Sequence, residues 1–254
     1  MDLGAITTNI LLILFLIAII AGFIDTLAGG GGLLTMPALL IAGVPPLAAL
    51  GTNKLQGSVG TATSTYMMLK HKRVSFSQIK IMMLFAFLGS ALGTIAVQFI
   101  NVDILSFIIP VVLIIIAVYF AISPMPHSND AKPRISDKKY NTLIIPIIGW
   151  YDGMFGPGTG SFFSFTGVSL KGFGLIKATA IAKPLNFATN IASLFVFIIA
   201  GKLVWLIGAV MMLGQIIGAW LGSHCLLKIN TLYLRALVVI MCISMVIKYV
   251  ITIN

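Results

Sequence analysis

The sequence predicts an all-α polytopic membrane protein with about eight transmembrane helices. Three observations lead to this fold class. Of the 254 residues, 59% are hydrophobic and only 9% are charged, whereas a soluble domain carries roughly 25% charged residues. The mean hydropathy is +1.10. Apolar runs close to the length of one membrane span recur along the chain, so most of the surface is expected to face lipid.

These apolar runs give the expected helices in order. Two short pieces, at about 33–43 and 160–169, each follow a glycine-rich break and are too short to cross a bilayer as helices. We expect them to be half-helices or arms of re-entrant hairpins. The longer runs fall at about 5–28, 47–69, 80–100, 104–122, 142–156, 175–200, 203–223 and 231–251.

The formal net charge of +10 would suggest a nucleic-acid partner in a soluble protein. Here the basic residues cluster in short loops, at 70–80 and 132–139, as the positive-inside rule requires. We therefore expect no nucleic-acid partner. The polar stretch 123–141 divides the chain near its middle. This organisation predicts a first membrane repeat at 1–122, a cytoplasmic linker loop at 123–141 and a second membrane repeat at 142–254.

The two halves repeat each other in sequence. Residues 22–25 match residues 149–152 at an offset of 127, and further on an offset of 129 pairs Lys54 with Lys183. The charge bias swaps between corresponding loops, which indicates that the tandem repeats are inverted relative to each other. Small residues typical of helix packing also recur at the offset of 129, which pairs Gly89 with Gly218 and Gly93 with Gly222.

Glycine-rich breaks are the strongest sign of a binding site. Interrupted backbone in a membrane is tolerated only where it is buried in protein or lines a wet cavity. In transporters, the N-termini of half-helices point free N–H groups at an anion near the middle of the membrane. The alternative role, close helix packing, is the one we prefer for the four glycines that pair at the offset of 129. The expected site residues in the two breaks are Gly29, Gly30, Gly31, Gly32, Gly156, Gly158, Thr159 and Gly160.

Two lysines within apolar runs are the second sign. An intramembrane cation is costly and marks a functional site by default, and Lys54 and Lys183 together would make an electropositive pocket. The alternative is that both side chains extend to the lipid headgroups. Neutral polar residues beside the lysines would replace the water shell of an anion, or else would bond helices together: Thr52, Asn53, Gln56, Asn186, Thr189 and Asn190.

Asp25 and Asp152 precede the two breaks at equivalent positions. Each carboxylate would cap backbone N–H groups, pair with a lysine, or carry a proton, and the sequence leaves these roles open. No histidine or cysteine pattern predicts a metal site, and no cofactor is expected. No Ser-His-Asp set, pair of catalytic carboxylates or HExxH motif is present, so we do not expect an enzyme.

At these residues the chain resembles the TauE/SafE family of sulfite exporters and anion permeases, over nearly its whole length. The resemblance implies a multi-pass protein of the bacterial inner membrane, with seven or eight helices, that transports sulfite, organosulfonates or related sulfur oxyanions. Opposite Thr52 and Asn53 the second half has Ile181 and Ala182, so a fully symmetric site is not expected. The segments that carry the resemblance are 22–32, Pro37, 50–55, 151–160 and 186–193.

The function expected from these features is secondary transport of a small anion, most specifically sulfite or an organosulfonate. A passive anion channel is the main alternative. A membrane-embedded enzyme is a weaker one, because it would need reactive side chains facing one another. The lipid bilayer is the only other partner that the sequence requires, and it leaves a homodimer open.

Overall fold

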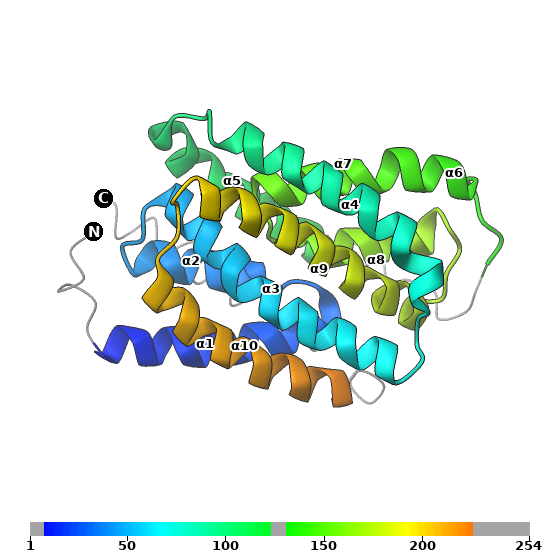
Figure 1. Cartoon of the computed structure of the whole chain (residues 1–254), viewed down its shortest axis with the longest axis horizontal. Coiled ribbons are helices and arrows are strands. Elements are labelled where there is room, and N and C mark those ends of the chain that lie inside the picture. The colour runs from blue at the N-terminus through cyan, green and yellow to red at the C-terminus, as the bar shows by residue number, and fades with distance from the viewer. Residues whose placement is uncertain (1–7, 123–130, 226–254) are drawn as a thin grey trace.

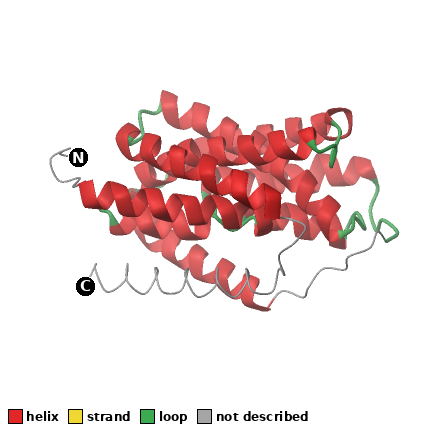
Figure 2. Cartoon of the chain, turned by 90° about the horizontal axis from the view of Figure 1, so that it is seen from below, coloured by secondary structure: helices red, strands yellow, loops and turns green. Residues whose placement is uncertain are grey.

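The computed structural model describes residues 8–122 and 131–225, and within these ranges the chain is helical and contains no strand (Figures 1 and 2). The helices run along the long axis of the molecule (Figure 1). In order, they are α1 (Thr8–Ala28), α2 (Gly32–Ile41), α3 (Pro46–Lys70), α4 (Phe76–Val97), α5 (Val102–Ile122), α6 (Asp137–Lys139), the π-helix η2 (Tyr140–Ile144), α7 (Ile145–Met154), α8 (Thr159–Ser169), α9 (Leu175–Ile199) and α10 (Trp205–Cys225).

The two short pieces predicted after the glycine breaks are present as α2 and α8. They contain 10 and 11 residues, which gives each a length of about 15 Å, half the hydrocarbon core of a bilayer. Helix α7 follows α6 and η2 without interruption, so helical structure begins at Asp137, within the segment that the sequence assigns to the linker. The predicted run at 231–251 lies outside the described residues.

Four of the described helices are long and apolar enough to cross a membrane: α1, α4, α9 and α10. Helix α3 has 25 residues but is more polar than these four, because its buried face contains lysine, asparagine, glutamine, serine and threonine side chains. The outward faces of α1, α4 and α10 instead present large apolar side chains. Examples that are at least half exposed are Leu12, Leu16, Leu84, Leu92, Leu213 and Trp220. An apolar exterior around polar internal helices is the arrangement expected in lipid.

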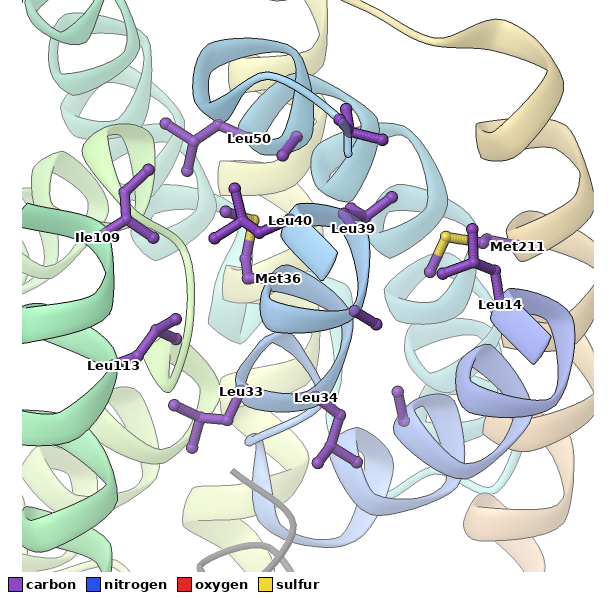
Figure 3. Packing of buried hydrophobic residues seen from close by; sticks show 14 of the residues in the cluster. Leu14, Leu33, Leu34, Met36, Leu39, Leu40, Leu50, Ile109, Leu113 and Met211 are labelled. Atoms are coloured by element: carbon purple, nitrogen blue, oxygen red, sulfur yellow. The ribbon is translucent and has the colours of Figure 1, made fainter. Parts of the chain in front are cut away.

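Helices from the first half of the chain pack against helices from the second half, and we call these crosswise pairs. Helix α4 lies along α7, α10 lies along α1, and α3 contacts α9. Short α2 is enclosed by its neighbours: Figure 3 shows its leucines between Leu14 and Met211 on one side and Ile109 and Leu113 on the other. This apolar packing holds the end of the first glycine break in place.

The connections of the bundle gather at its two ends. The α3–α4 turn, residues 131–136 and the α8–α9 turn lie together at one end (Figure 1), where Ala131 N–H donates to the Gly172 carbonyl at 2.7 Å. This end contains both predicted basic loops. The α4–α5 and α9–α10 connections lie at the opposite end (Figure 1).

Glycines allow the crosswise helix pairs to approach closely. A β-carbon on Gly89 or Gly93 would collide with the backbone of α7, and one on Gly218 or Gly222 would collide with the backbone of α1. The sequence-based preference for a packing role at these four positions agrees with these contacts.

We predict that Gly93→Ala destabilises the protein by about 1–3 kcal/mol, the usual cost of overpacking, because the added methyl group meets the Trp150 carbonyl. The melting temperature of the detergent-purified protein measures the effect. Leu92→Ala is the matched control, since Leu92 is 63% exposed on the outer face of the same helix. Equal melting temperatures for the two variants would contradict the packing role of Gly93.

Candidate functional site

The two glycine breaks meet at one point inside the bundle. A β-carbon on Gly160 would lie 2.8 Å from the Cα of Gly29, and the Ser161 hydroxyl donates to the carbonyl of Ala28. Gly29, Gly156 and Gly158 have φ values of +77°, +92° and +82°, a backbone conformation that favours glycine. The breaks therefore require glycine both for backbone shape and for close approach.

The two carboxylates beside the breaks hold the ends of the short helices. Asp25 Oδ1 accepts a 3.1 Å hydrogen bond from Gly31 N–H, at the start of α2. Asp152 Oδ1 accepts a 2.6 Å hydrogen bond from the Thr159 hydroxyl, at the start of α8. The sequence analysis predicts that the N–H groups at these helix starts face a bound anion. At α2 one of them is instead taken by the protein's own carboxylate.

Both lysines are buried at the same place. Lys54 Nζ on α3 lies 2.7 Å from Asp152 Oδ2 on α7, and both side chains are 1% exposed. Lys183 on α9 is fully buried, and its Nζ donates to the backbone carbonyl of Asp25 on α1. Neither lysine reaches the surface, so the headgroup alternative is wrong for both. Each lysine is bound to the aspartate residue that precedes the break in the opposite half of the chain.

A small cavity lies beside these pairs. Its volume is about 30 Å³, which is room for about two waters. Its walls come from α1, α3, α7, α9 and α10 and from the two breaks. The lining residues are Asp25, Gly31, Asn53, Gly57, Thr61, Asp152, Gly156, Asn186, Asn190 and Gln215.

Hydrogen bonds fix how the amide side chains present themselves. Asn190 Nδ2 donates to the Asn186 backbone carbonyl at 2.8 Å and to Asn186 Oδ1 at 3.2 Å. Because the carbonyl can only accept, this arrangement leaves the Asn186 NH₂ group for the cavity. Asn53 Oδ1 likewise accepts from Thr35 at 2.6 Å and from Gln56 at 2.7 Å. The cavity thus receives donor groups from amides whose oxygens are already bonded.

Comparison with known proteins agrees with this architecture. The family model for the sulfite exporter TauE/SafE matches residues 14–249. The chain belongs to this family. No solved structure matches the chain.

Three relatives of the TauE/SafE protein described here are named as probable membrane transporters. The Haemophilus influenzae protein is 43% identical over 250 residues, which cover 98% of this chain and 97% of the relative. ORF9 of a Sinorhizobium species is 42% identical and covers 94% and 92% of the two chains. YfcA of Escherichia coli K12 is 42% identical and covers 90% and 85%. These matches identify the chain as a membrane protein of a transporter family.

The residues expected at a TauE/SafE binding site fall into two groups. Asp25, Gly31, Asn53, Asp152, Gly156, Asn186 and Asn190 line the cavity. The others are not among its lining residues: Gly29, Gly30, Gly32, Gly158, Thr159 and Gly160 belong to the breaks, and Lys54, Gln56 and Lys183 bond to groups around the cavity.

Thr52 neither lines the cavity nor belongs to one of the breaks. Its Oγ1 accepts from Val204 N–H at 3.0 Å, ahead of α10, and it is not among the residues that line the cavity. The hydroxyl therefore holds the chain where it enters α10. Thr189, expected beside Asn190, bonds to the Asn186 carbonyl of its own helix at 2.9 Å.

Three cavity-lining residues were not predicted: Gly57, Thr61 and Gln215. Gly57 and Thr61 continue the four-residue spacing from Asn53, so helical periodicity points to them. Gln215 is 4% exposed within apolar α10, where an amide is unusual. Repeat matching could not find it, because the offset of 129 pairs it with Ala86.

We predict that Lys54→Met destabilises the protein by about 3–5 kcal/mol, because it leaves the Asp152 carboxylate buried without its partner. The double variant Lys54→Met/Asp152→Asn should recover much of this loss, since it leaves no unpaired charge. Unfolding in detergent measures both effects.

Lys171→Met is the control for this prediction. Lys171 also pairs with an aspartate, but that partner, Asp137, is 85% exposed, so the loss should be at most about 1 kcal/mol. A wild-type melting temperature for Lys54→Met would refute a stabilising ion pair.

Proposed function

We propose that this protein is a secondary transporter that moves a small oxyanion, sulfite or an organosulfonate, across the bacterial inner membrane. The family name, sulfite exporter TauE/SafE, and the names of the relatives support transport. The polar groups of the cavity support the substrate class. Asn53 and Asn186 present amide donors there, and an oxyanion offers only acceptors.

The observation that carries the proposal is the orientation of the cavity amides. Asn186 and Asn53 have oxygens that bond to the protein, so their NH₂ groups remain for a guest. Gln215 adds a third amide from α10, and Lys54 lies just behind Gly156. Hydrogen bonds from fixed donors replace the water that a small anion loses on entering the membrane.

Alternating access would come from motion of the two halves about this site. The proposed repeats are 1–122 and 142–254, inverted relative to each other. The crosswise contacts support them: Gly89 and Gly93 meet Pro146 and Trp150, while their counterparts at the offset of 129 meet residues 19 and 23. Residues 19 and 23 correspond to 146 and 150 at the offset of 127. Rocking of such halves about a shared central site is a known transport mechanism.

The charge at the two ends supports an orientation. Both basic loops lie at the end that contains the α3–α4 turn and residues 131–136 (Figure 1). Under the positive-inside rule, we place this end in the cytoplasm.

The first test is direct binding. Sulfite, thiosulfate and methanesulfonate should raise the melting temperature of the detergent-purified protein, while choline, a cation of similar size, should not. A ligand at a hundred times its Kd stabilises the folded state by about 2.7 kcal/mol. No shift with any of the three anions, together with no anion flux in liposomes, would refute the proposal.

The second test addresses the cavity amides. Gln215→Glu replaces an amide donor with a carboxylate. It should therefore raise the Kd of the anion by about ten- to a hundredfold, which corresponds to the loss of one hydrogen bond to a charged group. Gln78→Glu makes the same chemical change on an exposed residue at the basic end and should leave Kd unchanged. Equal affinities in the two variants would remove Gln215 from the site.

A further inference from the structure

The four charged side chains around the cavity, three of them buried and Asp25 partly buried, cancel in net charge. Lys54 and Lys183 contribute two positive charges, and Asp25 and Asp152 contribute two negative charges. Both carboxylates belong to residues that line the cavity, whereas the lysines lie behind the lining. An anion that entered this neutral cluster would meet two carboxylates at low dielectric, where repulsion is strong and poorly screened. Binding of an anion therefore needs an added positive charge.

We propose that Asp152 takes up a proton when the anion binds, so that the substrate crosses the membrane together with one proton. This inference rests on the proposed function. The proton adds to Oδ2 and converts the carboxylate to a neutral carboxylic acid, while Lys54 remains an ammonium group. The net charge of the cluster rises by one and matches a monoanion. Return of the proton to water on the other side restores the Lys54–Asp152 pair and releases the anion.

The position of Lys54 explains how protonation would open the site. Its Nζ lies 2.7 Å from Asp152, and a β-carbon on Gly156 would lie only 3.3 Å from that nitrogen. Gly156 itself lines the cavity. Once Asp152 is neutral, the ammonium group loses its counter-ion and faces the cavity past a residue without a side chain. A bound anion then replaces the carboxylate as the partner of Lys54.

Asp25 is less suited to this role. Its carboxylate already accepts the N–H of Gly31 at the start of α2. Lys183 bonds to the backbone carbonyl of Asp25, so protonation of the carboxyl group would not release that bond.

Other titratable groups near Asp152 do not compete for the proton. Tyr151, its neighbour on α7, donates its hydroxyl to the Pro157 carbonyl at 2.6 Å. Helices α2 and α8 contain no charged residue or histidine, and in α4 and α10 these occur only near one end, as Lys80 and His224. The proton site is therefore set by the two lysines and the two aspartates.

A proton suits these groups better than a metal cation. Hard cations such as Ca²⁺ and Mg²⁺ require about six oxygen ligands. Here Asp152 Oδ1 is bonded to Thr159, Oδ2 faces Lys54, and Asn53 Oδ1 already accepts two donors. A proton needs only one of these oxygens.

The test uses purified wild-type protein in liposomes with radiolabelled methanesulfonate, whose charge does not change with pH. Thiosulfate and sulfite are tested alongside. An outside pH one unit below the inside pH should drive about tenfold accumulation of methanesulfonate, because one pH unit is a tenfold ratio of protons. A protonophore should abolish the accumulation, and an inward sodium gradient at equal pH should produce none.

Asp152→Asn mimics the protonated side chain and separates coupling from binding. It should still exchange labelled for unlabelled methanesulfonate, but its pH-driven accumulation should fall from about tenfold to none. Asp137→Asn makes the same change at an exposed carboxylate and should retain the full accumulation. Should Asp152→Asn fail to fold, infrared difference spectra take its place. Methanesulfonate should then produce the carbonyl band of a protonated carboxylic acid in the wild type and in Asp25→Asn.

The outcomes are distinguishable. Uptake that ignores the pH gradient or follows sodium would overturn proton coupling and leave the transport proposal standing. Tenfold accumulation by Asp152→Asn, or loss of the infrared band in Asp25→Asn, would overturn the assignment to Asp152. If the wild type neither moves nor exchanges any of the three anions, the proposed function fails and this inference fails with it.

Discussion

The structure depends on the pairing of charges at the point where two helices are interrupted within the membrane. Breaking α1 from α2 and α7 from α8 exposes backbone groups that lipid cannot satisfy. The carboxylates of Asp25 and Asp152 bond to the starts of the next helices, but they bring negative charge into the same place. Lys54 and Lys183 offset that charge from α3 and α9. Backbone interruption, carboxylate and lysine are therefore three parts of one arrangement.

This arrangement explains the distribution of polarity among the helices. Helices α3 and α9 supply both lysines and most of the amides, so they occupy the interior and contact each other. Helices α1, α4 and α10 shield them and present leucine, isoleucine and tryptophan side chains outward. Glycines at the crosswise contacts let the shielding helices approach closely. Helix α3 is as long as α9, and its low hydropathy is a consequence of its place next to the site.

Much of this fold was accessible from the sequence, because hydropathy and glycine clusters report directly on the membrane environment. The long apolar runs, the short α2 and α8 and the burial of Lys54 follow from the cost of placing polar groups in lipid. The details of bonding do not follow from that cost. Nothing in the local sequence shows that Thr52 bonds to Val204 or that Lys183 reaches a carbonyl of α1. Such contacts depend on how helices cross, which hydropathy does not encode.

The cavity is less symmetric than the frame around it, and this difference separates architecture from recognition. Under the proposed duplication, Gly57 and Thr61 correspond to Asn186 and Asn190, and Gln215 corresponds to Ala86. The lysines and the aspartates that precede the breaks, by contrast, are present in both halves. The shared residues bond to one another and to the breaks, whereas the unshared residues form much of the cavity wall, where Asn186 and Gln215 contribute amide side chains. Building an interrupted helix pair imposes the same demands on each half, but a small anion has no two-fold symmetry to match. The asymmetric wall is therefore where substrate choice would be set.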